Sequence, residues 1–160
     1  MLTIKILCVG NLKENYLKEA FLEYQKRLSS FCRFEVKEIP EHKVSSNPTE
    51  SEINLAVSSE GEKLLSYLNK NNHVISLCIE GKEFSSKELS RHIQSVTISG
   101  KSTIVFIIGG SFGLSQEVKS SSNLNFSMSK LTFPHQLTRI MLTEQIYRAF
   151  QILSGGKYHK

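Results

Sequence analysis

The sequence lacks the features of several large protein classes. It has no tryptophan and only three prolines and three cysteines in 160 residues. The odd cysteine count, with no Cys-x-x-Cys pair, argues against a disulfide framework and predicts small buried hydrophobes at Cys8, Cys32 and Cys78 in a reducing compartment. No apolar run is long enough for a membrane span, and the first residues are typical of a strand and not of a signal peptide. We therefore expect a cytoplasmic protein with no membrane association.

Short catalytic motifs are also missing. The loop Gly109-Gly110-Ser111-Phe112-Gly113 is neither a dinucleotide fingerprint nor a P-loop. There is no Gly-x-Ser-x-Gly elbow, and no cysteine has an evident activating partner. The five histidines show no metal-ligand spacing, so no metal is expected, and His135 at a helix start has the context of a structural residue. These absences disfavour classical nicotinamide binding, ATP hydrolysis and catalysis by a serine or cysteine nucleophile.

Strand and helix patterns alternate along the whole chain. Strands are predicted at 3–9, 34–39, 74–79, 103–108 and 124–128, the third being followed by a turn at Gly81. Helices are predicted over about 17–28, 48–68, 86–99, 115–120 and 134–153. The second helix has a predicted start at Asn47-Pro48-Thr49-Glu50, and Ser85 to Glu88 has capping-box spacing. The alternation predicts one α/β domain over residues 1–160, with a mainly parallel sheet covered by helices on both faces.

Two of the predicted strands end in loops rich in small and polar residues. The strand 103–108 runs into the glycine loop 109–113, and the strand 124–128 runs into Ser129-Lys130-Leu131-Thr132-Phe133-Pro134. In open α/β sheets, ligands bind beyond the carboxyl ends of the strands. Closely spaced glycines let backbone groups approach a ligand without interference from a Cβ atom. The pattern predicts a small-molecule site at this edge, although a tight turn alone also explains the glycines.

The last predicted helix is apolar on two faces. Leu142, Ile146 and Phe150 share one face, while Ile140 and Tyr147 lie on the other, and one sheet covers only one face. Two interpretations remain open at this level. The helix carries a broad buried stripe within a monomer, or a second subunit covers its far side.

Charge and the C-terminal residues suggest a polyanionic partner. The formal net charge is +5 and the isoelectric point about 9.1, which mildly favours such partners. Glu144 and Arg148 are four residues apart and can pair along the helix, usually as a solvated pair of small energetic value. The tail from Gly155 to Lys160 combines a glycine hinge with an aromatic ring, an imidazole and two cations. It fits either a disordered end or an arm that folds over RNA.

Several of these motifs, in this order, resemble one family. They are Ile108-Gly109-Gly110-Ser111-x-Gly113, the run from Ser129 to Gln136, Glu144-Gln145-x-Tyr147-Arg148-Ala149 and the terminal Tyr158-His159-Lys160. Together they are similar to SPOUT-superfamily enzymes that methylate N3 of a pseudouridine in the 23S rRNA of the large ribosomal subunit. The resemblance spans the whole chain, with Phe112 bulkier than usual and Lys157 in place of a smaller residue or proline.

The resemblance implies a fold and a set of site residues. It implies S-adenosylmethionine as methyl donor, no metal, a C-terminal trefoil knot, and a homodimer with its site at the interface, acting on 23S rRNA within the ribosome. The implied cofactor pocket consists of Leu77, Gly109, Met128, Ser129, Lys130, Leu131, Thr132 and Phe133. His159 is the candidate general base, and Arg148 is the group that stabilises negative charge. Tyr158 is the residue that positions the nucleobase.

Two other functions share part of this evidence. A non-catalytic RNA-binding or ribosome-associated factor would have the basic charge and the tail without needing a cofactor pocket. A nucleotide-sensing regulator would need the pocket but not the basic tail. Methyl transfer is favoured because the sequence carries both features.

Overall fold

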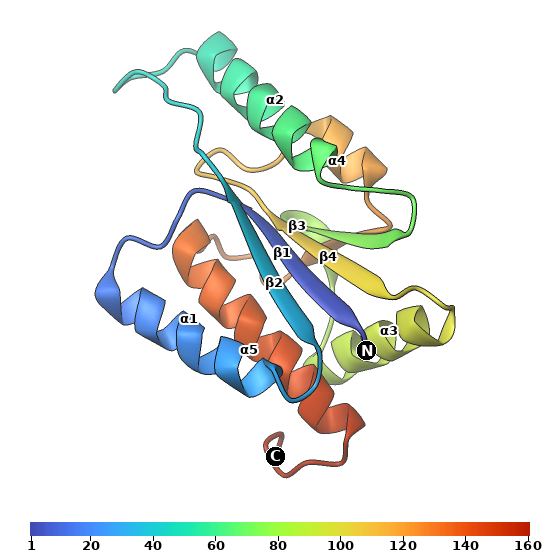
Figure 1. The fold of residues 1–160 in the computed structure, drawn as a ribbon. Coiled ribbons are helices and arrows are strands. Elements are labelled where there is room, and N and C mark those ends of the chain that lie inside the picture. The colour runs from blue at the N-terminus through green and yellow to red at the C-terminus, as the bar shows by residue number, and fades with distance from the viewer.

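Five parallel strands form the centre of the molecule, and helices cover both faces of the sheet (Figure 1). The computed structural model describes residues 1–160. In chain order the elements are β1 (Thr3–Val9), α1 (Asn15–Leu28), β2 (Arg33–Ile39), α2 (Glu50–Ser66), β3 (Asn72–Glu83), α3 (Ser86–Ile98), β4 (Thr103–Ile108), α4 (Gln116–Ser121), β5 (Leu124–Ser127) and α5 (His135–Leu153). The strand order is β2-β1-β4-β3-β5, and every pair is parallel. The predicted α/β class and parallel sheet are confirmed.

The sheet is covered by helices on both faces. Figure 1 shows α1, α3 and α5 on one face of the sheet and α2 with α4 on the other. The central strand β4 is buried from Ile104 to Ile108, with Phe106 and Ile107 fully inaccessible on opposite faces. Burying one such side chain contributes roughly 1.5–3 kcal/mol. The continuous apolar run of β4 therefore reflects a strand covered on both sides, which is characteristic of parallel sheets.

Side-chain caps fix the starts of α2 and α3. At α3, the Ser85 hydroxyl accepts from the Glu88 amide and the Glu88 carboxylate accepts from the Ser85 amide, as the spacing predicted. At α2 the predicted start was two residues early. Thr49 and Glu52 form the capping box, at 3.2 Å and 2.6 Å. Because this reciprocal pair satisfies two backbone donors, it defines the helix start in preference to Asn47.

Strand β3 continues beyond its predicted end at Ile79. It pairs with β5 at Leu77–Phe126 and, after a register shift, again at Lys82–Phe126. The extra residues of this bulge lie between the two pairings. A Cβ atom at Gly81 would lie 2.7 Å from the Asn125 carbonyl group, so only glycine fits against β5 there. The predicted turn at Gly81 is therefore a bulge inside a longer strand.

Helix α5 packs between α1 and α3, so the protomer itself covers part of the second apolar face. Ile140 is buried in a cluster with Leu12, Leu17 and Phe21. Leu137 remains exposed, and Tyr147 is only partly buried. The monomeric interpretation thus explains part of the far face and leaves the rest of it open to solvent.

A buried cation fixes the first turns of α5. The Arg139 side chain is 3% exposed and donates from Nη1 to Glu38 Oε2 and from Nη2 to the Gly10 carbonyl, both at 3.0 Å. These bonds join α5 to the carboxyl ends of β1 and β2. A buried charge is tolerated only when it is paired and hydrogen-bonded, so this contact sets the position of the helix start.

The end of α5 is closed by two glycines. The Gly156 amide donates to the Gln151 carbonyl and the Gly155 amide to the Ile152 carbonyl, and Gly155 has a φ of +71°. This is the Schellman arrangement, which satisfies helix-terminal carbonyls and reverses the chain. The predicted hinge is therefore a closed turn that directs the tail back along its own helix.

Candidate functional site

A cavity of about 770 Å³ lies at the carboxyl ends of β3, β4 and β5. Its volume falls within the range of small-molecule sites. Half of the lining residues are hydrophobic. The lining comes from the β3 bulge, the glycine loop after β4, the loop after β5 and the first turns of α5. The predicted edge of the sheet therefore carries a cavity formed by segments far apart in the sequence.

The structure gathers most of the residues expected to bind a cofactor. Six of the eight line this cavity: Leu77, Met128, Ser129, Leu131, Thr132 and Phe133. Gly109 and Lys130 do not line it, although Gly110 and Ser129 beside them do. Lys130 is solvent-exposed. A Cβ atom at Gly109 would lie 2.7 Å from the Gly113 carbonyl group, so the packing of the loop itself requires that glycine.

Other lining residues were not identified from the sequence. The β3 bulge contributes Cys78, Ile79 and Glu80, and α5 contributes His135 and Thr138. The one available signal for the bulge was Gly81, because a glycine within a strand pattern often marks a bulge or a close backbone approach. Cys8 and Cys32 are buried as predicted. The same prediction was wrong for Cys78, which is only half-buried because it lines the cavity.

The glycine loop is held rigidly at the cavity. Gly110 and Gly113 form a bridge in which the Gly113 amide donates to the Gly110 carbonyl at 3.1 Å. Gly113 has a φ of +81°, which favours glycine. The Ser111 hydroxyl donates to Glu41 Oε1 at 2.9 Å, which ties the loop to the segment after β2.

Charged and titratable groups surround the cavity. Lys119 pairs with Glu80, and this hydrogen bond lowers the pKa of the Glu80 carboxyl. Burial lowers the pKa of His135; Glu41 opposes this effect, and Arg139 and Lys13 add to it. The lining therefore includes a charged carboxylate that is paired with a lysine, and an imidazole that is neutral at physiological pH.

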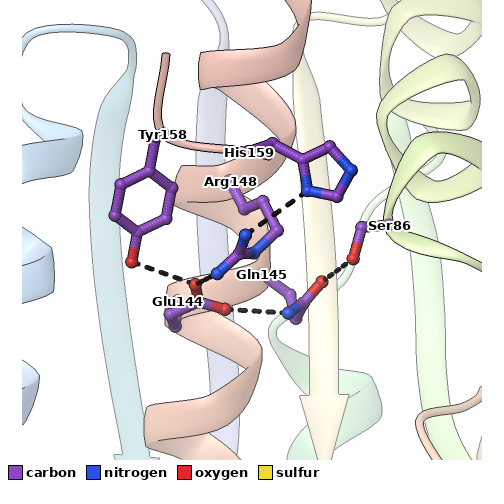
Figure 2. A network of polar contacts seen from close by, with 6 residues as sticks. All are labelled: Ser86, Glu144, Gln145, Arg148, Tyr158 and His159. Carbon is purple, nitrogen blue, oxygen red and sulfur yellow. Dashed lines mark hydrogen bonds and ion pairs between the residues drawn. The ribbon is translucent and has the colours of Figure 1, made fainter. Parts of the chain in front are cut away.

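A polar network joins the end of α5 to the tail (Figure 2). The Tyr158 hydroxyl donates to Glu144 Oε1 at 3.1 Å, and Arg148 forms an ion pair with the same carboxylate. Arg148 Nη1 lies 3.3 Å from His159 Nδ1, and its guanidinium stacks 4.8 Å from the centre of the Tyr158 ring. The predicted Glu144–Arg148 pair is confirmed, and the three candidate catalytic residues come together around it.

The network is anchored to a second helix. Gln145 Nε2 donates to Glu144 Oε2 at 2.8 Å, and the Ser86 hydroxyl of α3 donates to Gln145 Oε1 at 2.7 Å (Figure 2). Burial raises the pKa of the Tyr158 phenol well above its usual range, and the Tyr24 and Glu144 side chains add to this effect. Tyr158 therefore remains protonated and acts as a hydrogen-bond donor.

The contact with Arg148 assigns the tautomer of His159. A guanidinium can only donate, so Nδ1 must accept, and the proton of a neutral His159 ring is then on Nε2. In this arrangement Nδ1 is the basic atom, and it faces Arg148. His159 can therefore take a proton at Nδ1 only when it exchanges Arg148 for another donor.

The cavity lies at the start of α5, whereas the network is formed by the middle and C-terminal part of this helix and by the tail. His135 lines the cavity, whereas Arg148 belongs to the network. At 1.5 Å per residue, about 20 Å of helix separates them. In Figure 1 the C-terminal tail lies beside the last turn of α5, on the side where the strands begin. The cavity lies at the opposite side, where β3, β4 and β5 end. Within one protomer, the candidate catalytic residues do not reach the cavity.

A known family model covers almost the whole chain. A family model described as "Predicted SPOUT methyltransferase" matches residues 2–159. The chain belongs to the SPOUT methyltransferase family. It is therefore an enzyme.

Full-length relatives carry a common name. A protein of Streptococcus uberis is 47% identical over 157 residues, covering 98% of this chain and 99% of the relative. One of Leuconostoc mesenteroides is 46% identical over 159 residues, covering 99% and 100%. Both are named ribosomal RNA large subunit methyltransferase H.

Solved structures support the fold at low sequence identity. A Haemophilus influenzae structure described as "a probable methylase family protein" aligns with 98% of this chain and 70% of its own, at 12% identity and a TM-score of 0.54. This likeness concerns the fold alone.

None of the helices is both long and apolar enough to cross a membrane. The structure contains no cluster of three or more histidine, cysteine or acidic side chains suited to a metal ion.

Proposed function

We propose that this enzyme transfers a methyl group from S-adenosylmethionine to N3 of a pseudouridine in the 23S rRNA of the large ribosomal subunit. The observation that carries the proposal is the cavity at the carboxyl ends of β3, β4 and β5, formed by loops whose sequence resembles the cofactor site of such enzymes. The names of the full-length relatives support an rRNA substrate. The net charge of +5 suits a polyanionic partner.

The lining residues fit this cofactor. Leu77, Ile108 and Phe126 offer an apolar wall for the adenosyl group, and Gly110 and Gly113 leave backbone groups accessible. The hydroxyls of Ser129 and Thr132 add polar groups able to hydrogen-bond it. Whether Gly109 and Lys130 also contact it stays a prediction, since neither lines the cavity.

A homodimer resolves the separation between the cavity and the tail. In an antiparallel pairing of two α5 helices, the end of one lies beside the start of the other. The tail of one copy then approaches the cavity of its partner, which the tail cannot do within its own protomer. The exposed Leu137 and partly buried Tyr147 supply apolar surface for this contact.

The chain's own residues have distinct tasks in the transfer. S-adenosylmethionine, when bound, supplies a methyl group already activated by its sulfonium. The cavity and tail align the nitrogen with that methyl group, and positioning supplies most of the acceleration. His159 exchanges Arg148 for the imide N–H and takes its proton at Nδ1, a step typically worth ~10²–10⁴-fold. Arg148 stabilises the negative charge on the imide, and Tyr158 positions the nucleobase.

We also propose a trefoil knot in the C-terminal part of the chain and action in the cytoplasm on 23S rRNA within ribosomal particles. The knot rests on the resemblance to the family, and the glycine loop after β4 and the loop after β5 line the same cavity. A non-catalytic ribosome-associated factor would not need such a cavity.

The function is tested with purified protein and isotopically labelled methyl donor. Large subunits and whole ribosomes from cells lacking the protein should accept label, and mass mapping of nucleosides should place it on one pseudouridine. The proposal is wrong if no ribosomal particle accepts a methyl group and the protein binds neither S-adenosylmethionine nor S-adenosylhomocysteine.

A further inference from the structure

We infer that Phe112 is a stacking platform for a base of the substrate RNA, placed at the rim of the cofactor cavity. This inference rests on the proposed function and names a contact that the cofactor itself does not make. It begins from an unusual position for a large apolar side chain. Phe112 is 43% exposed, yet it lies in the short turn between Gly110 and Gly113 and lines the cavity.

The turn holds Phe112 in place from both sides. The bridge between Gly110 and Gly113 closes the turn, and Ser111 is bonded to Glu41. The tight packing of Gly109 against Gly113 leaves this turn little freedom. Because the backbone of the turn is already ordered, a ligand that stacks on the ring does not pay the entropic cost of ordering the loop, which favours binding.

The inner wall and the rim of the cavity differ in exposure. Ile108 and Phe126 are buried inner residues, whereas Phe112, Ile79 and Leu131 are exposed. A bound cofactor is expected to cover the inner wall. The RNA must reach the methyl group from solvent, across the exposed rim. The exposed Phe112 ring contributes little to the stability of the fold, and it is accessible to RNA that crosses the rim.

A nucleobase is the ligand that best fits this ring. Enzymes that act on a base take it out of the stack, and the exposed faces of that base and its neighbours need new stacking partners. Phenylalanine offers a flat face and no hydrogen-bonding group, so it suits stacking without sequence readout. The RNA base that stacks on Phe112 is thus either the target or a neighbour of it.

The test compares Phe112→Leu, which keeps apolar bulk, with Phe112→Tyr, which keeps the aromatic face. The matched control is Tyr67→Leu, because Tyr67 is 41% exposed, follows the end of α2 and does not line the cavity. Methylation of large ribosomal subunits is measured at saturating S-adenosylmethionine. Donor affinity is measured by calorimetry, and mass by light scattering.

Phe112→Leu should raise KM for the ribosomal particle at least about fivefold, because stacking on an aromatic residue is worth ~1–3 kcal/mol per base. Donor affinity and mass should stay unchanged, Phe112→Tyr should restore KM, and Tyr67→Leu should match the wild type. An unchanged KM, a loss confined to donor affinity, or a fall in mass overturns the inference while leaving the proposed function intact. Wild-type protein that methylates no particle contradicts both.

Discussion

Arg148 Nη1 lies 3.3 Å from His159 Nδ1, which joins the last helix to the tail through two residues expected to share one reaction (Figure 2). Glu144 supports this pair by binding both Arg148 and Tyr158. The tail is therefore held in place in the free protomer, with its basic nitrogen occupied. In the proposed mechanism, the tail exchanges these contacts for new ones when substrate binds.

Replacing Glu144 with glutamine should loosen the tail. The Glu144→Gln variant loses the ion pair with Arg148 and weakens the bond from Tyr158, so limited proteolysis after Lys157 should become several-fold faster. Glu23→Gln is the matched control, because Glu23 and Arg27 form an i,i+4 pair on α1. Equal cleavage rates in both variants and the wild type would show that the network does not hold the tail.

Filling the cavity should block the methyl donor. Leu77→Trp adds bulk to a half-buried wall residue and should weaken binding of S-adenosylhomocysteine at least tenfold by calorimetry, on the order of 1.4 kcal/mol or more. Leu22→Trp places the same ring on the exposed surface of α1 and should bind normally. This is a sharper test than a substitution at Gly109, where a side chain would meet the Gly113 backbone. Normal affinity in Leu77→Trp would place the donor elsewhere.

Glu60 should make stability depend on pH. It is 5% exposed, its Oε2 accepts from the His42 amide at 2.9 Å, and burial raises the pKa of its carboxyl. Because the folded pKa lies above the unfolded value, its contribution is fully present below about pH 4.5 and is lost as pH rises through the folded pKa. Glu60→Gln should remove that loss while keeping an acceptor for His42. Urea unfolding at pH 4 and pH 8 should show a smaller decline in the variant, and equal declines would contradict this account.

The parts of the fold that depend on local sequence could be predicted. The apolar runs of β1 and β4, the capping box at Ser85 and Glu88, and the helix that follows Pro134 all reflect interactions within a few residues. A small-molecule cavity at the edge where β4 and β5 end was likewise predicted, because strand ends in a parallel sheet converge at one edge. The individual cofactor residues after β5 came from the family resemblance, and Lys130 among them does not line the cavity.

The parts that depend on distant contacts could not be predicted. The β3 bulge exists because Leu77 and Lys82 both pair with Phe126, across more than forty residues of chain. The role of Arg139 depends on Glu38 and Gly10, which precede it by about a hundred residues or more. No local pattern encodes such partners, and the same limit applies to the distance between the tail and the cavity.

Mixing two inactive variants tests most directly whether one copy's tail serves its partner's cavity. One variant is Leu77→Trp, with an intact tail, and the other ends at Lys157, with an intact cavity. Each alone should methylate ribosomes poorly, while the truncated protein keeps its donor affinity. After subunit exchange the mixture should regain activity, whereas a mixture of Leu77→Trp with a chain carrying both changes should not. A mixture that stays inactive despite exchange, or a truncated enzyme that methylates at the wild-type rate, would contradict the account.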